Sequence, residues 1–192
     1  DANTTGDRNV ASGYGALSGN TTGSYNTAVG YAALFDQTTA TGNTAFGYKA
    51  GENVTTANSN VAIGYQSMPA ATTADNNVSV GKDACQDLTT GNNNVCVGGL
   101  AGADITTGAG NCCIGTQAGQ NQLTTTSHYL YIGRNAGAAG TAGVWIAADS
   151  NGANYQGNNS SSWSTTSDRR LKKNIVDNTK GLAEIDQLRV TN

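Results

Sequence analysis

The sequence is dominated by a short motif that recurs with a constant step of 17 residues. Residues 26–31 are Asn-Thr-Ala-Val-Gly-Tyr, residues 43–48 are Asn-Thr-Ala-Phe-Gly-Tyr, and residues 60–65 are Asn-Val-Ala-Ile-Gly-Tyr. Looser copies begin at Asn9, Asn77, Asn94 and Asn111, and a last copy at residues 129–133 arrives one residue late. Such regular repetition is typical of a solenoid, in which each repeat forms one turn and packs on its neighbours.

Within each copy, the three residues after the Asn alternate between larger and small side chains. This pattern predicts a short strand whose first and third side chains share one face and whose middle side chain lies on the other. The Gly that follows ends the strand, as expected where φ is positive or another backbone passes closely. We predict an all-β fold, a parallel β-solenoid or β-roll of 17-residue rungs. Each rung has one firm strand, a weaker second segment around a Thr-Thr pair, and two turns, and stacked Asn side chains form amide ladders between rungs.

Small side chains are restricted to particular positions of the repeat. The middle strand position is mostly Ala, Ser or Cys, and three residues after the Gly stands Ala, or Ser67 in one copy. Rungs of small residues bury little apolar area, so one stack of eight would be marginally stable. We therefore expect the chain to form a homotrimer of parallel shafts. The expected sites of tight packing are Ala28, Ala45, Ala62, Cys96 and Cys113.

Charge and periodicity divide the chain into three parts. Residues 1–166 carry four basic and nine acidic side chains, whereas residues 167–192 carry six basic and four acidic ones. We predict a β-repeat shaft at residues 1–137, a capping strand and linker at 138–166, and a separate C-terminal segment at 167–192. Residues 144–148 are expected to form a strand, with Trp145 and Trp163 covering the end of the stack. The repeats carry no basic patch and no apolar run of membrane-spanning length, so neither nucleic acid nor membrane insertion is expected.

The four cysteines leave two interpretations open. Cys96 and Cys113 occupy the same position of adjacent repeats, and a disulfide between them is compatible with a rung spacing of about 4.8 Å. The interpretation that we favour is that Cys fills a small buried position that Ala or Ser fills elsewhere. There is no C-x-x-C pair and the one His is His128, so we expect no zinc site, no other metal and no cofactor.

Two further columns of the repeat suggest binding or catalysis. Tyrosines follow the Gly on four successive rungs, which predicts ring stacking along the shaft or, as the alternative, a carbohydrate-binding strip; they are Tyr14, Tyr31, Tyr48 and Tyr65. Asp87 and Asp104 share one position on adjacent rungs, and carboxylates about 5 Å apart are the spacing of a retaining glycosidase. Because this position lies in a polar loop and is Asn or Ala in other copies, we expect no catalysis there.

Two stretches resemble known families. The Asn-Val-Ala-Ile-Gly strand with its following Ala or Ser resembles the head repeats of trimeric autotransporter adhesins, which are trimeric left-handed β-rolls. Residues 167–175, Ser-Asp-Arg-Arg-Leu-Lys-Lys-Asn-Ile, resemble the opening of the C-terminal intramolecular chaperone domain of phage tail fibres and tailspikes, the self-cleaving endosialidase-type family. The Thr-Thr-Gly and Asn-Thr-Ala-x-Gly-Tyr repeats are also similar to shafts that precede that domain.

The chaperone resemblance implies a self-cleavage site. In that family a serine–lysine dyad releases the chaperone after it has trimerised the fibre, and the matching residues are Ser167 as nucleophile and Lys172 as base. The other matching positions of the motif are Asp168, Arg170, Leu171, Asn174 and Ile175. From the residues alone, without the resemblance, Ser167 is better interpreted as the cap of a helix and Lys172 as a solvated charge. A helix is expected at about residues 180–188, and only the first part of such a domain is present.

These observations together predict the homotrimeric shaft of a virion tail fibre, located outside the cell. The shaft presents a region that binds a host cell-surface receptor or glycan, and it is no enzyme apart from cleavage at Ser167. One alternative is the head of a bacterial trimeric surface adhesin. The other is a tailspike that depolymerises host polysaccharide.

Overall fold

The computed structural model describes residues 2–121, 123–134, 144–148 and 154–156. The chain divides into two compact units, Asp1–Ser162 and Trp163–Asn192. The described residues all belong to the first unit, so the expected dyad at Ser167 and Lys172 and the expected helix at residues 180–188 lie outside them. The strands are β1 (Val10–Ser12), β2 (Thr27–Val29), β3 (Thr44–Phe46), β4 (Val61–Ile63), β5 (Val78–Val80), β6 (Val95–Val97), β7 (Cys112–Ile114), β8 (Leu130–Gly133), β9 (Val144–Ala148) and β10 (Asn154–Gln156).

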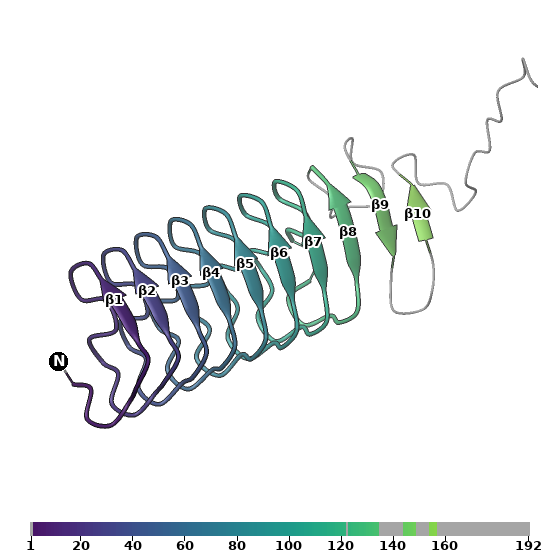
Figure 1. Ribbon diagram of the computed structural model, residues 1–192. Helices are drawn as coiled ribbons and strands as arrows, with labels where there is room; N and C mark the ends of the chain where they lie inside the picture. The colour runs from purple at the N-terminus through teal and green to yellow at the C-terminus, as the bar shows by residue number, and fades with distance from the viewer. Residues whose placement is uncertain (1, 122, 135–143, 149–153, 157–192) are drawn as a thin grey trace, which may run out of the picture. The chain divides into compact units, whose positions relative to one another are not determined.

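The strands form a single sheet in chain order, from β1 to β10. β1 to β8 are parallel, and each strand lies beside the strand of the next turn, as the stacked turns of Figure 1 show. The register follows the repeat, since Ala28 pairs with Ala45. At the last turn Cys112 pairs with Leu130, which is 18 residues away and confirms the one-residue shift. The predicted parallel β-solenoid is therefore confirmed.

The parallel stack ends with a change of direction. β9 pairs with β8 antiparallel, and β10 pairs with β9 antiparallel. β9 confirms the strand expected at residues 144–148. On the last turn of the parallel stack, two aromatic rings pack against the buried cluster. They belong to Tyr129 and Tyr131, and their stacked rings have centroids 6.0 Å apart. The side chain of Trp145, expected to cover this end, lies outside the described side chains.

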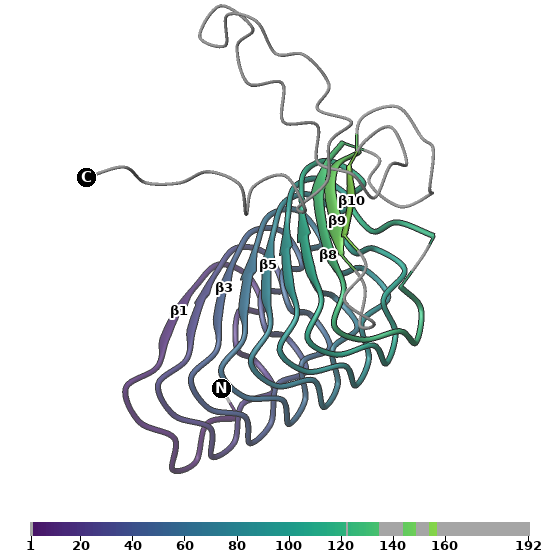
Figure 2. The same cartoon turned by 90° about the vertical axis from the view of Figure 1, so that its right-hand side faces the viewer.

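The Thr-Thr pair, around which we predicted a weaker second segment, forms a bend in each turn and not a strand. The carbonyl of Thr38 accepts three hydrogen bonds from the previous turn, from the backbone N of Thr21 at 2.8 Å, the backbone N of Thr22 at 3.2 Å and the hydroxyl of Thr21 at 3.0 Å. Because one carbonyl receives two successive N–H groups, the chain cannot maintain the alternating hydrogen bonds of a strand. The first Thr of the pair repeats this hydroxyl contact along the solenoid, which forms a second ladder between the turns. Figure 2 shows the bends stacked in line.

The asparagine at each rung start forms the predicted amide ladder. Its side-chain oxygen accepts the backbone N–H of the next Asn along the stack, at 2.8–2.9 Å from Asn26 to Asn111. Tyr129, which takes the place of Asn on the last rung, donates its N–H to Asn111 at 3.0 Å. The Asn side chains from Asn26 onward are buried. Their amides therefore bind adjacent turns together at positions that water does not reach.

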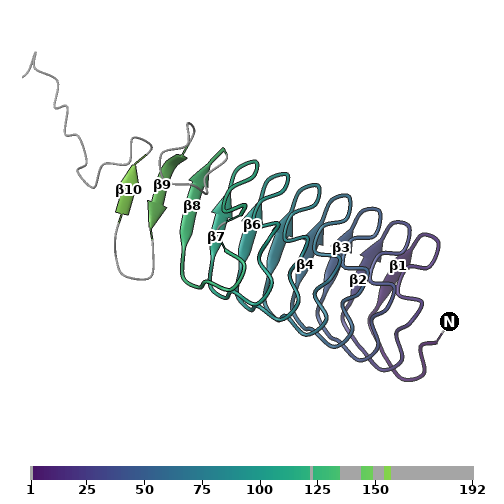
Figure 3. The ribbon, with the colours of Figure 1, turned by 180° about the vertical axis from the view of Figure 1, so that it is seen from behind.

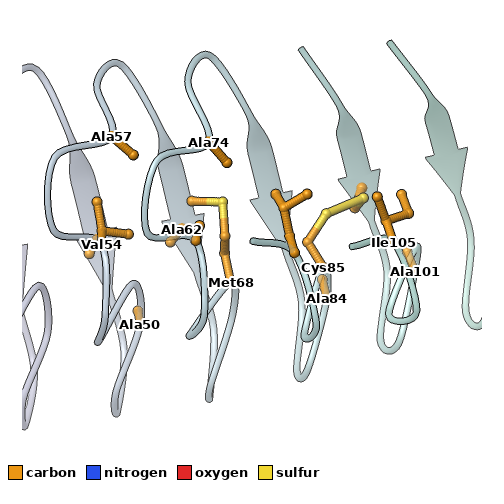
Figure 4. Close-up of a cluster of buried hydrophobic side chains, with 14 of the residues drawn as sticks. Ala50, Val54, Ala57, Ala62, Met68, Ala74, Ala84, Cys85, Ala101 and Ile105 are labelled. Atoms are coloured by element: carbon orange, nitrogen blue, oxygen red, sulfur yellow. A yellow bond between two sulfur atoms is a disulfide. The ribbon is translucent and has the colours of Figure 1, made fainter. Parts of the chain in front are cut away.

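The core of the solenoid is a narrow column in which large and small residues complement each other (Figure 4). A Cβ added to Gly51 would lie 3.3 Å from Val54, and one added to Gly102 would lie 2.8 Å from Ile105. Where the glycine position is instead Met68, the residue three positions later is Ala71, and both are fully buried. The two core positions, three residues apart, thus fill a similar volume together in each turn, but the turns differ in which of the two holds the larger side chain.

The middle residues of the strands point into this core. Ala28, Ala45, Ala62, Cys96 and Cys113 are all buried within the cluster of their own chain. Their small size is explained by contacts inside one solenoid, where the opposite wall lies close. These residues are therefore not available to partner chains, and contacts between copies would have to use the outer surface of the solenoid. The homotrimer stays a prediction.

Candidate interaction surfaces

The outer face of the sheet carries the largest exposed apolar surface that the strands build. The first and third residues of each strand point away from the core and are half-buried or exposed. Phe46 is 57% exposed, Ile63 38% and Ile114 39%. None of the outward positions of β1 to β8 holds a charged residue. The outward positions of β1 to β8 therefore form an uncharged face of apolar and hydroxyl side chains.

The four tyrosines form the predicted ring stack beside the sheet. The ring centroids of Tyr14, Tyr31, Tyr48 and Tyr65 are 5.1–5.3 Å apart with interplanar angles of 10–13°. The inner rings therefore have a neighbour over each face, and the ammonium of Lys82 lies 5.8 Å from the centroid of Tyr65. A sugar that stacks on an aromatic ring needs a free face, and the outer face of Tyr14, which is 76% exposed, offers the most accessible one. The carbohydrate strip stays a prediction.

The lysines that border this strip are each neutralised by a carboxylate of their own chain. The Nζ of Lys49 lies 2.8 Å from Glu52, and that of Lys82 lies 2.6 Å from Asp83. These hydrogen bonds to the carboxylates raise the pKa of both lysines above the ordinary value. Neither Lys49 nor Lys82 is therefore free to attract an anionic ligand.

The cysteines pair differently from the bond that we considered. Cys85 and Cys96 form a disulfide across 11 residues, with their Cα atoms 6.3 Å apart. Cys113 is a free buried thiol, and burial raises its pKa to about 12. The pairing follows from two columns that meet inside the core, since a Cβ on Gly51 would lie 3.8 Å from the Cβ of Ala62, also 11 residues ahead. The contact between these two columns indicates the correct cysteine pair, and it cannot be deduced from the 17-residue period of the sequence.

Cys112 is the one free thiol on the outer face. It is the first residue of β7, half-buried, while its neighbour Cys113 points inward. Burial raises the pKa of Cys112 above the ordinary value.

The acidic residues of the loops gather into no metal-binding cluster among the described residues. Asp104 accepts a hydrogen bond at 2.6 Å from the backbone N of Asn121, the residue that occupies the same position on the next rung. Within the described ranges no group of three or more His, Cys, Asp or Glu side chains converges to hold a metal ion. The described part of the chain also contains no helix long and apolar enough to cross a membrane.

A third ladder between the turns, beside those of Asn and Thr, was missed from the sequence. The side-chain oxygens of Asn58, Asp75 and Asn92 each accept the backbone N–H of the residue 17 positions earlier, at 2.6–2.8 Å. Apart from Ala109, the column contains Asp, Ser, Thr and Asn, so the property that its members share is a side-chain acceptor and not one residue type.

Comparison of the chain with protein-family models, with curated proteins and with solved structures finds no match.

Proposed function

We propose that this chain is the structural shaft of a homotrimeric virion tail fibre, which holds a region that binds a host receptor or glycan away from the particle. The observation that carries the proposal is the uninterrupted parallel stack of β1 to β8. Ladders of Asn and Thr hydrogen bonds join every pair of neighbouring turns. A stack joined this way resists bending and separation, which suits a part whose work is mechanical.

Two further observations support the proposal. The uncharged apolar face of the sheet favours self-association of the chain over a monomer in solution. The motif at residues 167–175, with Ser167 and Lys172, resembles the start of the chaperone that trimerises phage fibres. Depolymerisation of polysaccharide is not the function that we propose, since a carboxylate oxygen of Asp104 already accepts the backbone N–H of Asn121.

The mass of the chain in solution tests the assembly. We expect light scattering at micromolar concentration to give about three times the chain mass of 19.4 kDa. A stable monomer over the whole concentration range would contradict the proposal.

Self-cleavage at Ser167 is tested on a chain that continues through the complete downstream domain. We expect release of a shaft that ends at residue 166, and loss of this release in Ser167→Ala and in Lys172→Ala. The conservative variant Lys173→Arg serves as the control and should still cleave. Unchanged release from Ser167→Ala would show that the dyad is wrong.

A further inference from the structure

We propose that residues 70–74 form a joint in the solenoid, a segment that opens away from its neighbouring turns while the strands stay paired, and that the open joint is a cleavage site for an endoprotease. The inference goes beyond the shaft function and does not depend on the number of chains. The joint belongs to the turn between β4 and β5. The strands lie along one side of every turn, as the opposite views in Figures 1 and 3 show, and the joint lies outside them.

Hydrogen bonds that recur in other turns are absent along the joint. Among the described residues, the backbone N–H groups of Ala70, Ala71 and Thr72 donate to no acceptor. At the equivalent positions of the next turn all three N–H groups donate to backbone carbonyls, at 2.9–3.3 Å; they belong to Asp87, Leu88 and Thr89. The hydroxyl of Thr72 also makes the longest contact of the Thr ladder, 3.4 Å to the carbonyl of Thr89, against 2.7–3.2 Å for the others. The joint is therefore held less firmly than its equivalents.

The side chain of Asn60 shows the same loss from the inside of the turn. In other turns the Asn amide nitrogen donates to the carbonyl 14 residues further on, at 2.7–2.9 Å, as from Asn26 to Ala40. The equivalent acceptor for Asn60 is Ala74, but the amide nitrogen of Asn60 is buried without a hydrogen-bond partner among the described residues. An unsatisfied buried donor costs free energy, and opening of the turn relieves this cost because water reaches the amide.

The sequence of residues 68–71, Met-Pro-Ala-Ala, explains why this turn is the loosened one. In the other described turns, a larger buried side chain at the position of Ala71 anchors the segment in the core; these residues are Asn20, Gln37, Val54, Leu88, Ile105 and Leu123. Here Met68 fills the core instead (Figure 4), and Ala71 contributes only its methyl group. Pro69 is the single proline of the chain, and its ring fixes the local backbone. Thr72 is accordingly exposed, whereas its equivalents on the two adjacent turns are half-buried.

The strand side of the same turn keeps its hydrogen bonds. β4 and β5 pair in register, with Val61 opposite Val78. The N–H of Val78 donates to Asn94 at 2.8 Å, which is also the distance of the equivalent bonds of Val61 and Val95. Opening is therefore confined to the joint, and the paired strands act as its hinge. Native proteins open in this way, through the least stable segment while the rest stays folded.

The open joint suits an endoprotease that cleaves after small residues. Residues 70–74 are Ala-Ala-Thr-Thr-Ala, without a charged or aromatic side chain, and Thr72 and Thr73 are already exposed. A protease acts on a folded chain through its transiently opened segments. Hydrolysis of one peptide bond consumes one water and leaves a carboxylate and an amine, so the cut needs no further reactant.

Hydrogen exchange, read residue by residue by NMR on the intact chain, tests the opening. Thr73 and Thr90 are equivalent residues whose N–H groups both donate, at 3.3 Å and 3.2 Å. We expect Thr73 to exchange at least about tenfold faster, because fewer bonds hold its segment closed. Val78 should exchange as slowly as Val95. Equal rates at Thr73 and Thr90 would overturn the joint, and exchange at Val78 as fast as at Thr73 would overturn the strands as its hinge.

A repaired variant tests the cleavage site. It carries the sequence of residues 51–54 in this turn, through the substitutions Met68→Gly, Pro69→Glu, Ala70→Asn and Ala71→Val. We expect pancreatic elastase to cut the folded wild type within residues 70–75 and to spare Ala57, which holds the position of Ala74 on the preceding turn. The variant should resist the cut and slow the exchange of Thr73 to that of Thr90. It keeps Ala74 and gains a valine, both accepted by elastase, so its resistance reports the closed turn.

The cleavage is read by mass spectrometry, with both chains unfolded in urea as the control that elastase accepts their sequences. Cutting of the folded variant as fast as the wild type, or of the wild type at Ala57 as fast as at the joint, would overturn the cleavage site. Neither result depends on whether the chain is a monomer or a trimer, so failure of the joint and failure of the proposed function are distinguishable.

Discussion

The glycine after each strand is the residue that the backbone constrains most. Along the column from Gly13 to Gly133, φ lies between 121° and 142°. A Cβ on Gly64 would lie 2.6 Å from the carbonyl oxygen of Gly81 and 2.7 Å from its carbonyl carbon. A side chain at this position is therefore disfavoured for two reasons: φ is positive, and the backbone of the next turn occupies the space that a Cβ would need.

Gly64→Ala is accordingly expected to lower the free energy of unfolding by about 1–3 kcal/mol or more. Gly99→Ala is the matched control, because its φ is not in the left-handed region and its nearest neighbour is the oxygen of Lys82 at 3.8 Å. The control should change stability by no more than about 0.5 kcal/mol. Urea unfolding at a constant m-value measures both. Equal effects of the two substitutions would contradict the close approach.

The buried thiol of Cys113 gives stability a defined dependence on pH. Its pKa in the folded chain is about 12, against 9.0 for the ordinary thiol. Below pH 9 both states are protonated and the contribution is fully present. As the pH rises above 9 the unfolded chain ionises first, so the free energy of unfolding falls by about 1.4 kcal/mol per pH unit until about pH 12. Urea unfolding from pH 8 to 10.5 should show this slope, and Cys113→Ala should lack this part of it.

The repeating structural element of this protein is one turn of the solenoid. The stability of a turn depends on how the side chains at two of its core positions divide the available volume between them. Met68 and Ala71 are both fully buried, and they correspond to the contacting pairs Gly51–Val54 and Gly102–Ile105 of other turns. We expect Met68→Ala to cost about 2–5 kcal/mol by opening a cavity. Adding Ala71→Leu should recover part of that loss, although Ala71→Leu alone should cost about 1–3 kcal/mol by overpacking. Additive free energies in this double-mutant cycle would show that the two positions do not share space.

At the scale of the whole molecule, the constant period predicts which deletions the solenoid accepts. Removing residues 95–111 joins Asn94 to Cys112, keeps every column in place and brings Cys113 to the position of Cys96 beside Cys85. The shortened chain should fold with one parallel strand fewer and unfold cooperatively. Removing residues 95–110 instead shifts the strand by one residue, which turns its inward side chains outward. This deletion also places Ile114 at the position of Gly98, where φ is 132°. Circular dichroism and urea unfolding should distinguish the folded deletion from the disrupted one, and equal behaviour would contradict the register.

Much of the architecture could be predicted from the sequence because the interactions that define the fold recur with the same period as the sequence. The Asn amide ladder, the strand at each repeat, its terminal Gly and the late last copy all follow from residues that recur at one step. The tyrosine stack follows from the same periodicity, since equivalent side chains of successive turns lie side by side. The site expected at Ser167 lies outside the described residues, so it stays a prediction from resemblance.

The sequence alone thus determined the strand of each turn, the period and the Asn amide ladder, because each depends on contacts between equivalent residues. Which face points inward depends on contacts between different columns, and only the tertiary structure decided it: Ala28 and its equivalents lie in the core, and Phe46 lies outside. The same holds for the Cys85–Cys96 bond and for left-handed conformations at residues such as Lys49 and Asp83, with φ of 55° and 53°. Those conformations are not encoded by Gly, and each is held by the backbone N–H of the residue, which donates to a carbonyl of the previous turn: Lys49 to Tyr31 at 2.8 Å and Asp83 to Tyr65 at 3.0 Å. An alternating pattern places two faces on opposite sides of a strand, but the closure of the turn selects the one that is buried.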